Sequence, residues 1–276
     1  KKLSYSLYGN KNGIPILCHH GNPGSRLFWG LLPSKMFYER FYIISPDRPG
    51  YGYSSSFGSS NIEIWPGLVQ ILIDHLDIKR MHIIGVSGGC PYVLSAIIHK
   101  PELFDKVILI SPLGPYNKDS KGNMNINRYM FKYANKFSGL LYFQFSVITN
   151  ILKKSPLAFI NLLKRKLDGN DRLTIENEEI QEKYMSDILE CYRNGFDGSF
   201  HDCLIPGNWP IDLSTINKSI HIWYGDQDRS IGNMAEYLSQ NIENAEAHIV
   251  RNAGHFLILT NIEVIISSLL MNKEAS

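Results

Sequence analysis

Short apolar runs that alternate with helical patterns are the feature that most constrains the fold of this chain. Amphipathic stretches such as Ile64–Leu76 and Pro91–His99 separate the runs. Strands that alternate with helices predict an α/β fold, a mostly parallel twisted sheet with helices on both faces. Ligands of such sheets bind beyond the carboxyl ends of the strands. The predicted strands are Leu3–Tyr8, Ile14–Cys18, Phe41–Ser45, Met81–Gly85, Val107–Ile110, Ile220–Tyr224 and Ala247–Val250.

One long interval, residues 116–212, interrupts the alternation and contains no convincing strand. It opens with a polar segment, Tyr116–Asn127, which is expected to be a loop. We therefore predict a core made of residues 1–115 and 213–276, into which residues 116–212 are inserted as a helical lid. The helical stretches of the lid are Arg128–Phe137, Leu140–Lys153, Leu157–Leu167 and Glu176–Arg193.

The pentapeptide GVSGG, residues 85–89, lies where an apolar run gives way to a helix. A strand that turns into a helix so abruptly strains the residue at the turn, and flanking glycines relieve the crowding because they lack a Cβ. The helix that follows directs its free N–H groups and positive dipole end at the central Ser87. This G-x-S-x-G pattern is typical of a nucleophile elbow. The alternative is a small residue in a tight turn.

A serine hydroxyl is a poor nucleophile by itself, so it needs a base and an acid that orients the base. His255 lies in the loop RNAGHFL after the last apolar run, where the preceding glycine lets the backbone turn the imidazole inward. The loop GDQDRSI after the run before it carries two candidate acids, Asp226 and Asp228. The order serine, aspartate, histidine is the triad order of one particular fold.

Acyl transfer also requires donors for the oxyanion that develops during the reaction. The loop HHGNPGS after Ile14–Cys18 is glycine-rich and is expected to run over the same site. Pro23 has no N–H group, so the backbone N–H of Asn22 is the natural second donor. The first donor would be the N–H of Gly88, the residue after the serine.

The sequence contexts of the other histidines indicate structural roles. His19 and His20 would point to opposite sides of a strand, and no H-E-x-x-H pattern accompanies them, so we predict no metal site and no cofactor. His201 lies near Cys203, but no glycine supports it, which favours a structural role over a Cys–His pair. Packing or surface positions are expected for the histidines inside predicted elements: His75, His82, His99, His221 and His248.

Bulk composition narrows the classes of function. The 276 residues carry a formal net charge of +2, with 44% hydrophobic and 20% charged residues, so nothing points to nucleic acid or to an anionic membrane. The segment FLILTNIEVIISSLLM comes closest to a membrane span, but Asn261 and Glu263 interrupt it. It favours an amphipathic helix that closes the domain.

The cysteines show no C-x-x-C spacing, which favours buried free thiols in a reducing compartment, and we therefore expect a cytoplasmic protein. Cys90 lies one helical turn past Ser87, where core packing is favoured over a position at the border of the site. The four cysteines are Cys18, Cys90, Cys191 and Cys203.

Several motifs together resemble the α/β-hydrolase fold superfamily: HGNPGS, DRPGYGYS, GVSGGCPY, GNWPIDL and NAGHFLIL. The resemblance covers nearly the whole chain and implies the α/β-hydrolase fold with an inserted lid. In that family the acid lies three residues after the glycine that ends its strand, which is Asp228, and Asp226 then organises the loop. The implied triad and oxyanion donors are Ser87, Asp228 and His255 with Asn22 and Gly88.

The resemblance predicts a serine hydrolase that acts on a small-molecule ester. The large apolar side chains of residues 129–148 favour uncharged, apolar or aromatic acyl groups. Carbon–carbon bond hydrolases and peptidases use the same triad and stay open, whereas a serine at position 87 argues against carboxylate-nucleophile dehalogenases and epoxide hydrolases. A non-catalytic small-molecule receptor or scaffold is the alternative from another class, and the intact triad favours the enzyme. The oligomeric state is left open.

Overall fold

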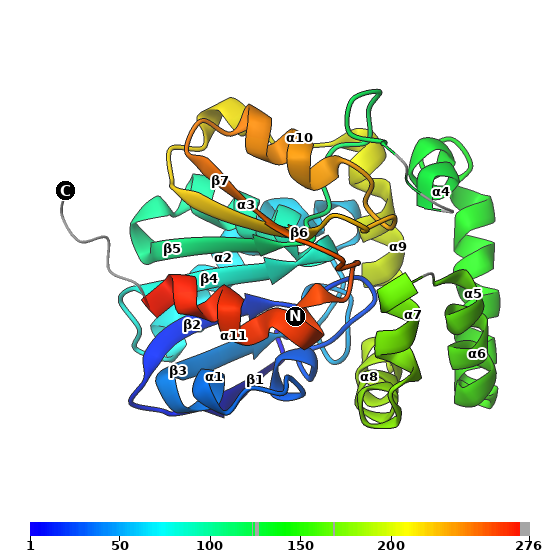
Figure 1. Cartoon of the computed structure of the whole chain (residues 1–276), viewed down its shortest axis with the longest axis horizontal. Coiled ribbons are helices and arrows are strands. Elements are labelled where there is room, and N and C mark those ends of the chain that lie inside the picture. Colours follow the sequence, from blue (N-terminus) through cyan, green and yellow to red (C-terminus); the bar gives the residue numbers. More distant parts are fainter. Residues whose placement is uncertain (123, 125–126, 168, 271–276) are drawn as a thin grey trace.

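A seven-stranded sheet forms the centre of the protein in a computed structural model that describes residues 1–122, 124, 127–167 and 169–270 (Figure 1). The strand order is β1-β3-β2-β4-β5-β6-β7; β1 pairs antiparallel with β3, and the other pairs are parallel. The predicted α/β fold class with a mostly parallel sheet is confirmed. The strands are β1 Tyr5–Gly9, β2 Ile14–His19, β3 Phe41–Pro46, β4 Met81–Val86, β5 Phe104–Ile110, β6 Ile220–Gly225 and β7 Ala245–Val250.

Helices cover both faces of the sheet because the central strands are apolar on both faces. Successive residues of a strand point to opposite sides. Ile83 and Val107 accordingly pack on one side, and Ile84 and Ile108 on the other. The first side is covered by α2 (Asn61–His75), α3 (Cys90–His99) and α10 (Met234–Asn241), the second by α1 (Lys35–Arg40) and α11 (Leu257–Leu270). Short 3-10 turns lie at Phe28–Gly30, Gly58–Ser60, Ser87–Gly89, Pro101–Leu103, Pro206–Asn208 and Leu213–Thr215.

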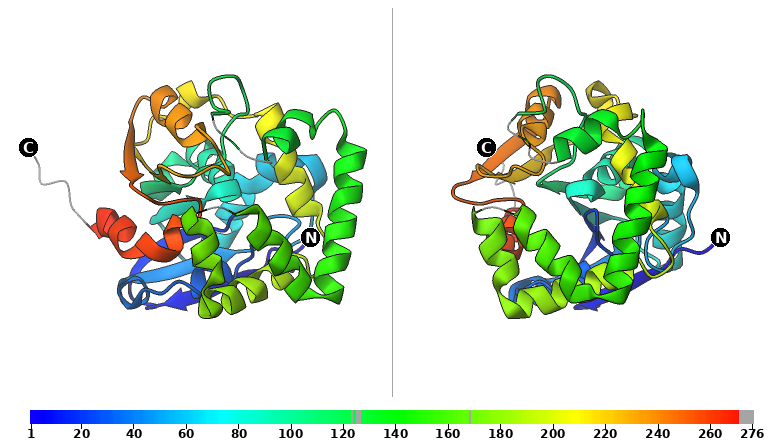
Figure 2. Two further views of the ribbon diagram at one scale, coloured as in Figure 1. Left: turned by 45° about the vertical axis from the view of Figure 1, so that its right-hand side comes forward. Right: turned by 90° about the vertical axis from the view of Figure 1, so that its right-hand side faces the viewer.

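A group of helices between β5 and β6 lies beyond the carboxyl ends of the strands, on the right in Figure 1. The right-hand view in Figure 2 looks onto these inserted helices. The segment predicted as a loop, Tyr116–Asn127, has no helix or strand among its described residues before Asn127; residues 123, 125 and 126 lie outside the described part. The inserted helices are α4 Asn127–Tyr133, α5 Ser138–Lys154, α6 Pro156–Lys166, α7 Gly169–Glu176, α8 Glu178–Cys191 and α9 Asp197–Leu204.

The single helix predicted for Glu176–Arg193 is wrong at its start. Helix α7 ends at Glu176 and α8 begins at Glu178, because the Asn177 side chain accepts a hydrogen bond from the N–H of Ile180 at 3.1 Å. This contact is a helix N-cap, which asparagine favours. The C-terminal helix packs its apolar face on the sheet as predicted, as far as Leu270; Met271 lies outside the described residues.

All four cysteines are free and buried, as their spacing predicts. Cys90 is fully buried, and its thiol lies 3.2 Å from the carbonyl oxygen of Gly85, so it packs in the core as predicted. None of the helices in the described part of the chain is long and apolar enough to cross a bilayer.

Candidate active site

Ser87 lies at the turn between β4 and α3, at the carboxyl edge of the sheet. Its φ is +51°, in the left-handed region that residues with a Cβ rarely adopt. The flanking glycines are required by close contacts. A Cβ on Gly85 would lie 2.7 Å from a side-chain carbon of Val93, and a Cβ on Gly89 would lie 2.5 Å from the carbonyl oxygen of His20. The backbone therefore has the strained turn that the glycine pattern predicts.

His255 connects Ser87 to Asp228. Its Nε2 atom lies 3.0 Å from the Ser87 Oγ atom, and its Nδ1 atom lies 2.8 Å from the Asp228 Oδ2 atom. An ionised carboxylate can only accept a hydrogen bond, so Nδ1 carries the proton and its N–H group donates a hydrogen bond to Asp228. Nε2 is then free to accept the serine proton. The structure thus brings together the three side chains that the sequence analysis selected, from the loops after β4, β6 and β7.

The two candidate acids, Asp226 and Asp228, differ in burial and in hydrogen bonding. Asp228 is buried, and its Oδ1 atom accepts hydrogen bonds from the N–H groups of Ser230 at 2.9 Å and Ile231 at 3.4 Å. These contacts leave Oδ2 directed at the histidine. Asp226 has an exposed side chain, and its backbone N–H donates to the carbonyl oxygen of Val250 at 3.1 Å. The geometry therefore favours Asp228 as the partner of His255.

The loop after β2 runs beside the serine turn because β2 and β4 are neighbours in the sheet. A Cβ built on Gly88 would lie 2.8 Å from the Asn22 Cβ atom and 3.3 Å from the Asn22 backbone nitrogen. A Cβ on Gly21 would lie 3.5 Å from the Ser87 Cβ atom. The two backbone N–H groups expected to bind an oxyanion, those of Asn22 and Gly88, thus belong to adjacent stretches of backbone next to Ser87.

A buried arginine connects this loop to the inserted helix α9. Arg48 is fully buried, forms an ion pair with Asp202 of α9, and donates a hydrogen bond to the Gly21 carbonyl oxygen at 2.9 Å. Its guanidinium lies 4.6 Å from the ring centres of both Tyr51 and Tyr92. Both phenol groups donate to Asp202, at 2.5 and 2.7 Å. The buried cation is therefore neutralised and enclosed, the condition for tolerating it.

A second carboxylate from the inserted helices reaches the histidine loop. Asp171, in the first turn of α7, accepts hydrogen bonds from the backbone N–H groups of His255 at 2.8 Å and Phe256 at 2.9 Å. The contact is close enough that a Cβ on Gly254 would lie 2.4 Å from the Asp171 carboxyl carbon. The sequence analysis missed both Asp171 and the Arg48–Asp202 pair.

The surroundings of His255 favour its protonated form more than water does. Burial lowers the pKa of His255, but the nearby carboxylates of Asp228 and Asp171 outweigh burial and raise it above its ordinary value. Burial raises the pKa of Asp171, and the two backbone hydrogen bonds and His255 only partly offset this effect. The base and the carboxylate that holds its backbone are therefore electrostatically coupled.

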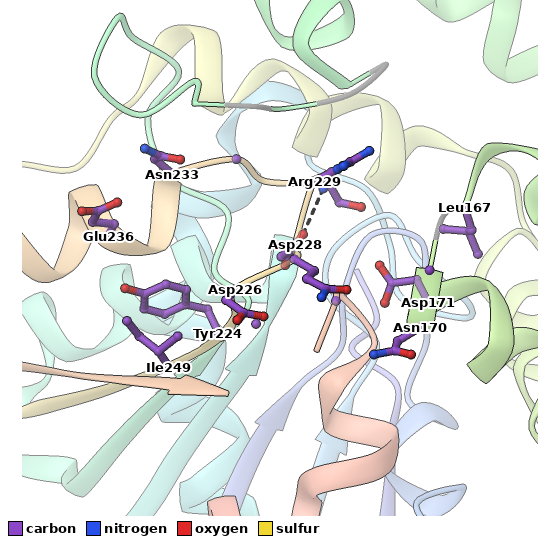
Figure 3. A pocket seen from close by; sticks show the side chains of 16 residues that line it. Leu167, Asn170, Asp171, Tyr224, Asp226, Asp228, Arg229, Asn233, Glu236 and Ile249 are labelled. Atoms are coloured by element: carbon purple, nitrogen blue, oxygen red, sulfur yellow. Dashed lines mark hydrogen bonds between the residues drawn. The ribbon is translucent and has the colours of Figure 1, made fainter. Parts of the chain in front are cut away.

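A polar cavity of about 510 Å³ lies beside the acid rather than over the serine (Figure 3). Its lining includes Asp171, Asp226, Asp228 and Glu236. Neither Ser87 nor His255 lines this cavity or two others outlined by the described residues. The cavity therefore belongs to the loop that carries the acid and is not the acyl pocket expected above the serine.

Three histidines outside the triad have packing contacts that favour structural roles. His19 accepts a hydrogen bond from the Trp65 indole at 2.9 Å, and burial and then the charge of Arg48 lower its pKa to about 3. His20 accepts from the Arg48 backbone N–H at 3.2 Å, and the same two causes lower its pKa well below its usual range. His201 packs edge-on against Phe200, with ring centres 5.0 Å apart. These three imidazoles are engaged in packing.

Comparison with known proteins identifies the family. The sequence profile of the alpha/beta hydrolase fold matches residues 14–262. A Mycoplasma genitalium protein, provisionally named a proline iminopeptidase, is 32% identical to this chain over 140 residues. The match covers 49% of this chain and 45% of that protein. The match thus spans less than half of that relative. The 2-hydroxymuconate semialdehyde hydrolase of Pseudomonas putida is 24% identical over 94% of this chain and 86% of its own.

Solved structures share the fold over the whole chain. A carboxylesterase structure from Nitrososphaera gargenis superimposes with a TM-score of 0.70 at 14% identity, covering 97% of this chain and 92% of that chain. An esterase from Thermogutta terrifontis gives a TM-score of 0.64 at 17% identity, with 97% and 91% covered. At such identities the likeness shows the fold alone. The profile match over residues 14–262 shows more: this chain belongs to the alpha/beta hydrolase fold family.

Proposed function

We propose that the protein is a serine hydrolase that cleaves carboxylic esters with uncharged, apolar or aromatic acyl groups. The observation that carries the proposal is the continuous hydrogen-bonded chain from the Ser87 Oγ atom through His255 to Asp228. The strained φ of +51° at Ser87 supports it, because such strain in a residue with a Cβ concentrates at functional sites.

In the proposed reaction, Ser87 attacks the ester carbonyl carbon while His255 Nε2 takes the hydroxyl proton. Asp228 holds the imidazole in the tautomer with the proton on Nδ1 and stabilises the imidazolium that forms. The N–H groups of Asn22 and Gly88 receive the charge on the carbonyl oxygen. His255 then protonates the leaving alkoxide, and water cleaves the acyl-enzyme by the same route in reverse.

The inserted helices support the preference for apolar acyl groups. Helix α5 has several large apolar side chains that remain exposed, including Leu140, Phe143 and Val147, and the same helix packs Phe145 against Phe196. Leu140–Leu152 contains no charged residue that could hold a charged acyl group. We therefore assign residues 116–212 the role of a lid over the serine, and each acyl methylene that it buries would add up to about 0.8 kcal/mol of binding.

Two measurements test the proposal. Incubation with a fluorophosphonate, followed by peptide mass spectrometry, should place the adduct on Ser87, and Ser87→Ala should remain unlabelled. The kcat/KM over p-nitrophenyl esters from acetate to decanoate, with benzoate and succinate, should rise with acyl length and be lowest for succinate. A folded protein without the adduct would refute the nucleophile, whereas a flat profile or a preference for succinate would refute only the acyl preference.

Carbon–carbon bond hydrolysis is the second candidate. A relative that matches this chain over most of both lengths, from Pseudomonas putida, is named a 2-hydroxymuconate semialdehyde hydrolase. The same triad serves this chemistry. Turnover of 2-hydroxymuconate semialdehyde with Ser87 intact, faster than that of any ester in the panel, would favour this second candidate.

A further inference from the structure

Strands β6 and β7 bring two histidines and a glutamate together on one face of the sheet. His221 pairs with Glu246 in the register of the two parallel strands, and Trp223 pairs with His248. Since side chains alternate along a strand, all four point to one face, the face that α11 covers. From the sequence alone, His221 and His248 were expected to have packing or surface roles.

One possible ligand atom from each of the three residues lies within 4.8 Å of the other two. The His221 Nδ1 atom lies 3.0 Å from the His248 Nε2 atom and 3.5 Å from a Glu246 carboxylate oxygen. The His248 Nε2 atom lies 3.6 Å from the other carboxylate oxygen. Zinc bonds of about 2.0–2.1 Å in a tetrahedral arrangement place neighbouring ligand atoms about 3.3–3.4 Å apart. The three observed distances lie on both sides of this value.

The surroundings hold the ligands in place and leave them accessible from the solvent. The Trp223 ring stacks on His248 with centres 4.3 Å apart and planes at 14°, which fixes the orientation of that imidazole. The two histidines are about one-fifth exposed and Glu246 is largely exposed, so an ion can enter from the solvent side. On the neighbouring strand, Lys106 donates to the Leu269 carbonyl oxygen at 2.9 Å, at the end of α11.

We propose that His221, Glu246 and His248 bind one divalent cation of the zinc class, with water as the fourth ligand. Two imidazoles and one carboxylate are a donor set that suits zinc rather than magnesium or calcium, which prefer oxygen ligands. The strands that the ion would join are the two whose following loops carry Asp228 and His255. The three ligands lie on β6 and β7, two and three strands away from β4, whose end carries Ser87, so we assign the ion the role of fastening β7 to β6 rather than a part in the reaction.

The test uses the full chain without a polyhistidine tag, freed of metal by a chelator. Isothermal titration with ZnCl2 should show one site per chain, and Co²⁺ should give the visible absorption of a tetrahedral centre. Zinc should raise the melting temperature, because an ion that binds only the folded state stabilises it. His248→Gln and Glu246→Gln should each weaken zinc binding at least about tenfold, while the exposed His75→Gln on α2 should leave it unchanged.

Three outcomes would overturn the proposal: zinc affinity equal in the wild type and His248→Gln, an unchanged melting temperature with zinc, or absence of the tetrahedral cobalt spectrum. X-ray absorption of the zinc-loaded wild type gives an answer even if a variant fails to fold. It should show two imidazole nitrogens among four light ligands, and a zinc environment without imidazole would equally reject the site.

Discussion

The loop that carries His255 and the loop that carries Asn22 both contact the inserted helices, but through different kinds of contact. We call these two loops the histidine side and the oxyanion side of the candidate site. On the oxyanion side, Asp202 of α9 is fully buried and satisfied by Arg48 and two phenol groups. On the histidine side, Asp171 of α7 accepts two backbone N–H groups and has a raised pKa. One contact is a buried charge pair, whereas the other is a carboxylate whose charge helps to raise the pKa of the base that it holds.

The difference indicates that the two sides respond to different perturbations. The ion pair around Arg48 stabilises the position of the oxyanion loop, so its loss should appear mainly as a loss of fold stability. The Asp171 contact touches the backbone of His255, so its loss should appear mainly in the pH dependence of the reaction. Three substitutions, two of them with matched controls, separate these expectations, and they follow in order of decreasing effect.

The largest effect is expected inside the histidine side itself. Asp228→Asn should lower the rate of fluorophosphonate labelling of Ser87, and kcat for the best ester, by about 10⁴-fold, because the amide favours the wrong imidazole tautomer. Asp226→Asn changes the same charge on the same loop at an exposed position and should cost far less. Equal losses in the two variants would contradict the assignment of the acid.

On the oxyanion side, Asp202→Asn should destabilise the protein by about 3–5 kcal/mol, because it leaves the buried Arg48 charge without its partner. The free energy of unfolding in urea measures this effect. Asp197→Asn, on an exposed position of the same helix, is the matched control and should cost less than about 1 kcal/mol. A buried pair that contributes nothing would give the same unfolding free energy in both variants.

Asp171→Asn should change the pH profile more than the stability. His255 acts as a base only when neutral, so kcat/KM rises with pH as this group loses its proton. Removal of the Asp171 charge removes one cause of the raised pKa of His255. The acid limb of the profile should therefore move to lower pH. On the plateau, kcat/KM should fall by less than about tenfold, because the substitution weakens one hydrogen bond to the histidine loop. An acid limb that stays in place, or that moves to higher pH, would show that the two groups are not coupled.

The residues that the sequence analysis selected are those whose signal is local. Ser87, Asp228 and His255 each follow a strand by a few residues, and each stands beside glycine or in a short turn. A reader of the sequence can therefore place them at the same edge of a parallel sheet without knowing any long-range contact. The same logic placed Asn22 and Gly88 near the serine.

The residues that were missed depend on contacts between distant segments. Asp171 bonds to a backbone 84 residues away, and Asp202 pairs with an arginine 154 residues away. Nothing in the local pattern of α7 or α9 marks these aspartates, since both read as ordinary polar positions of a helix. The cluster on β6 and β7 was missed for a related reason: it depends on which residues face each other across two strands, and register is not visible in either strand alone.

The positive φ of Ser87 has a consequence for the stability of the whole protein. A side chain in the left-handed region costs about 1–2 kcal/mol, and glycine adopts this conformation without that cost. Ser87→Gly should therefore melt at a higher temperature than the wild type while it loses all labelling, which differential scanning calorimetry and mass spectrometry can check on one sample. A lower melting temperature would show that the turn is relaxed. If Ser87→Gly melts at the higher temperature, the protein is most stable in a form that cannot react. One backbone angle then sets a trade-off between stability and activity.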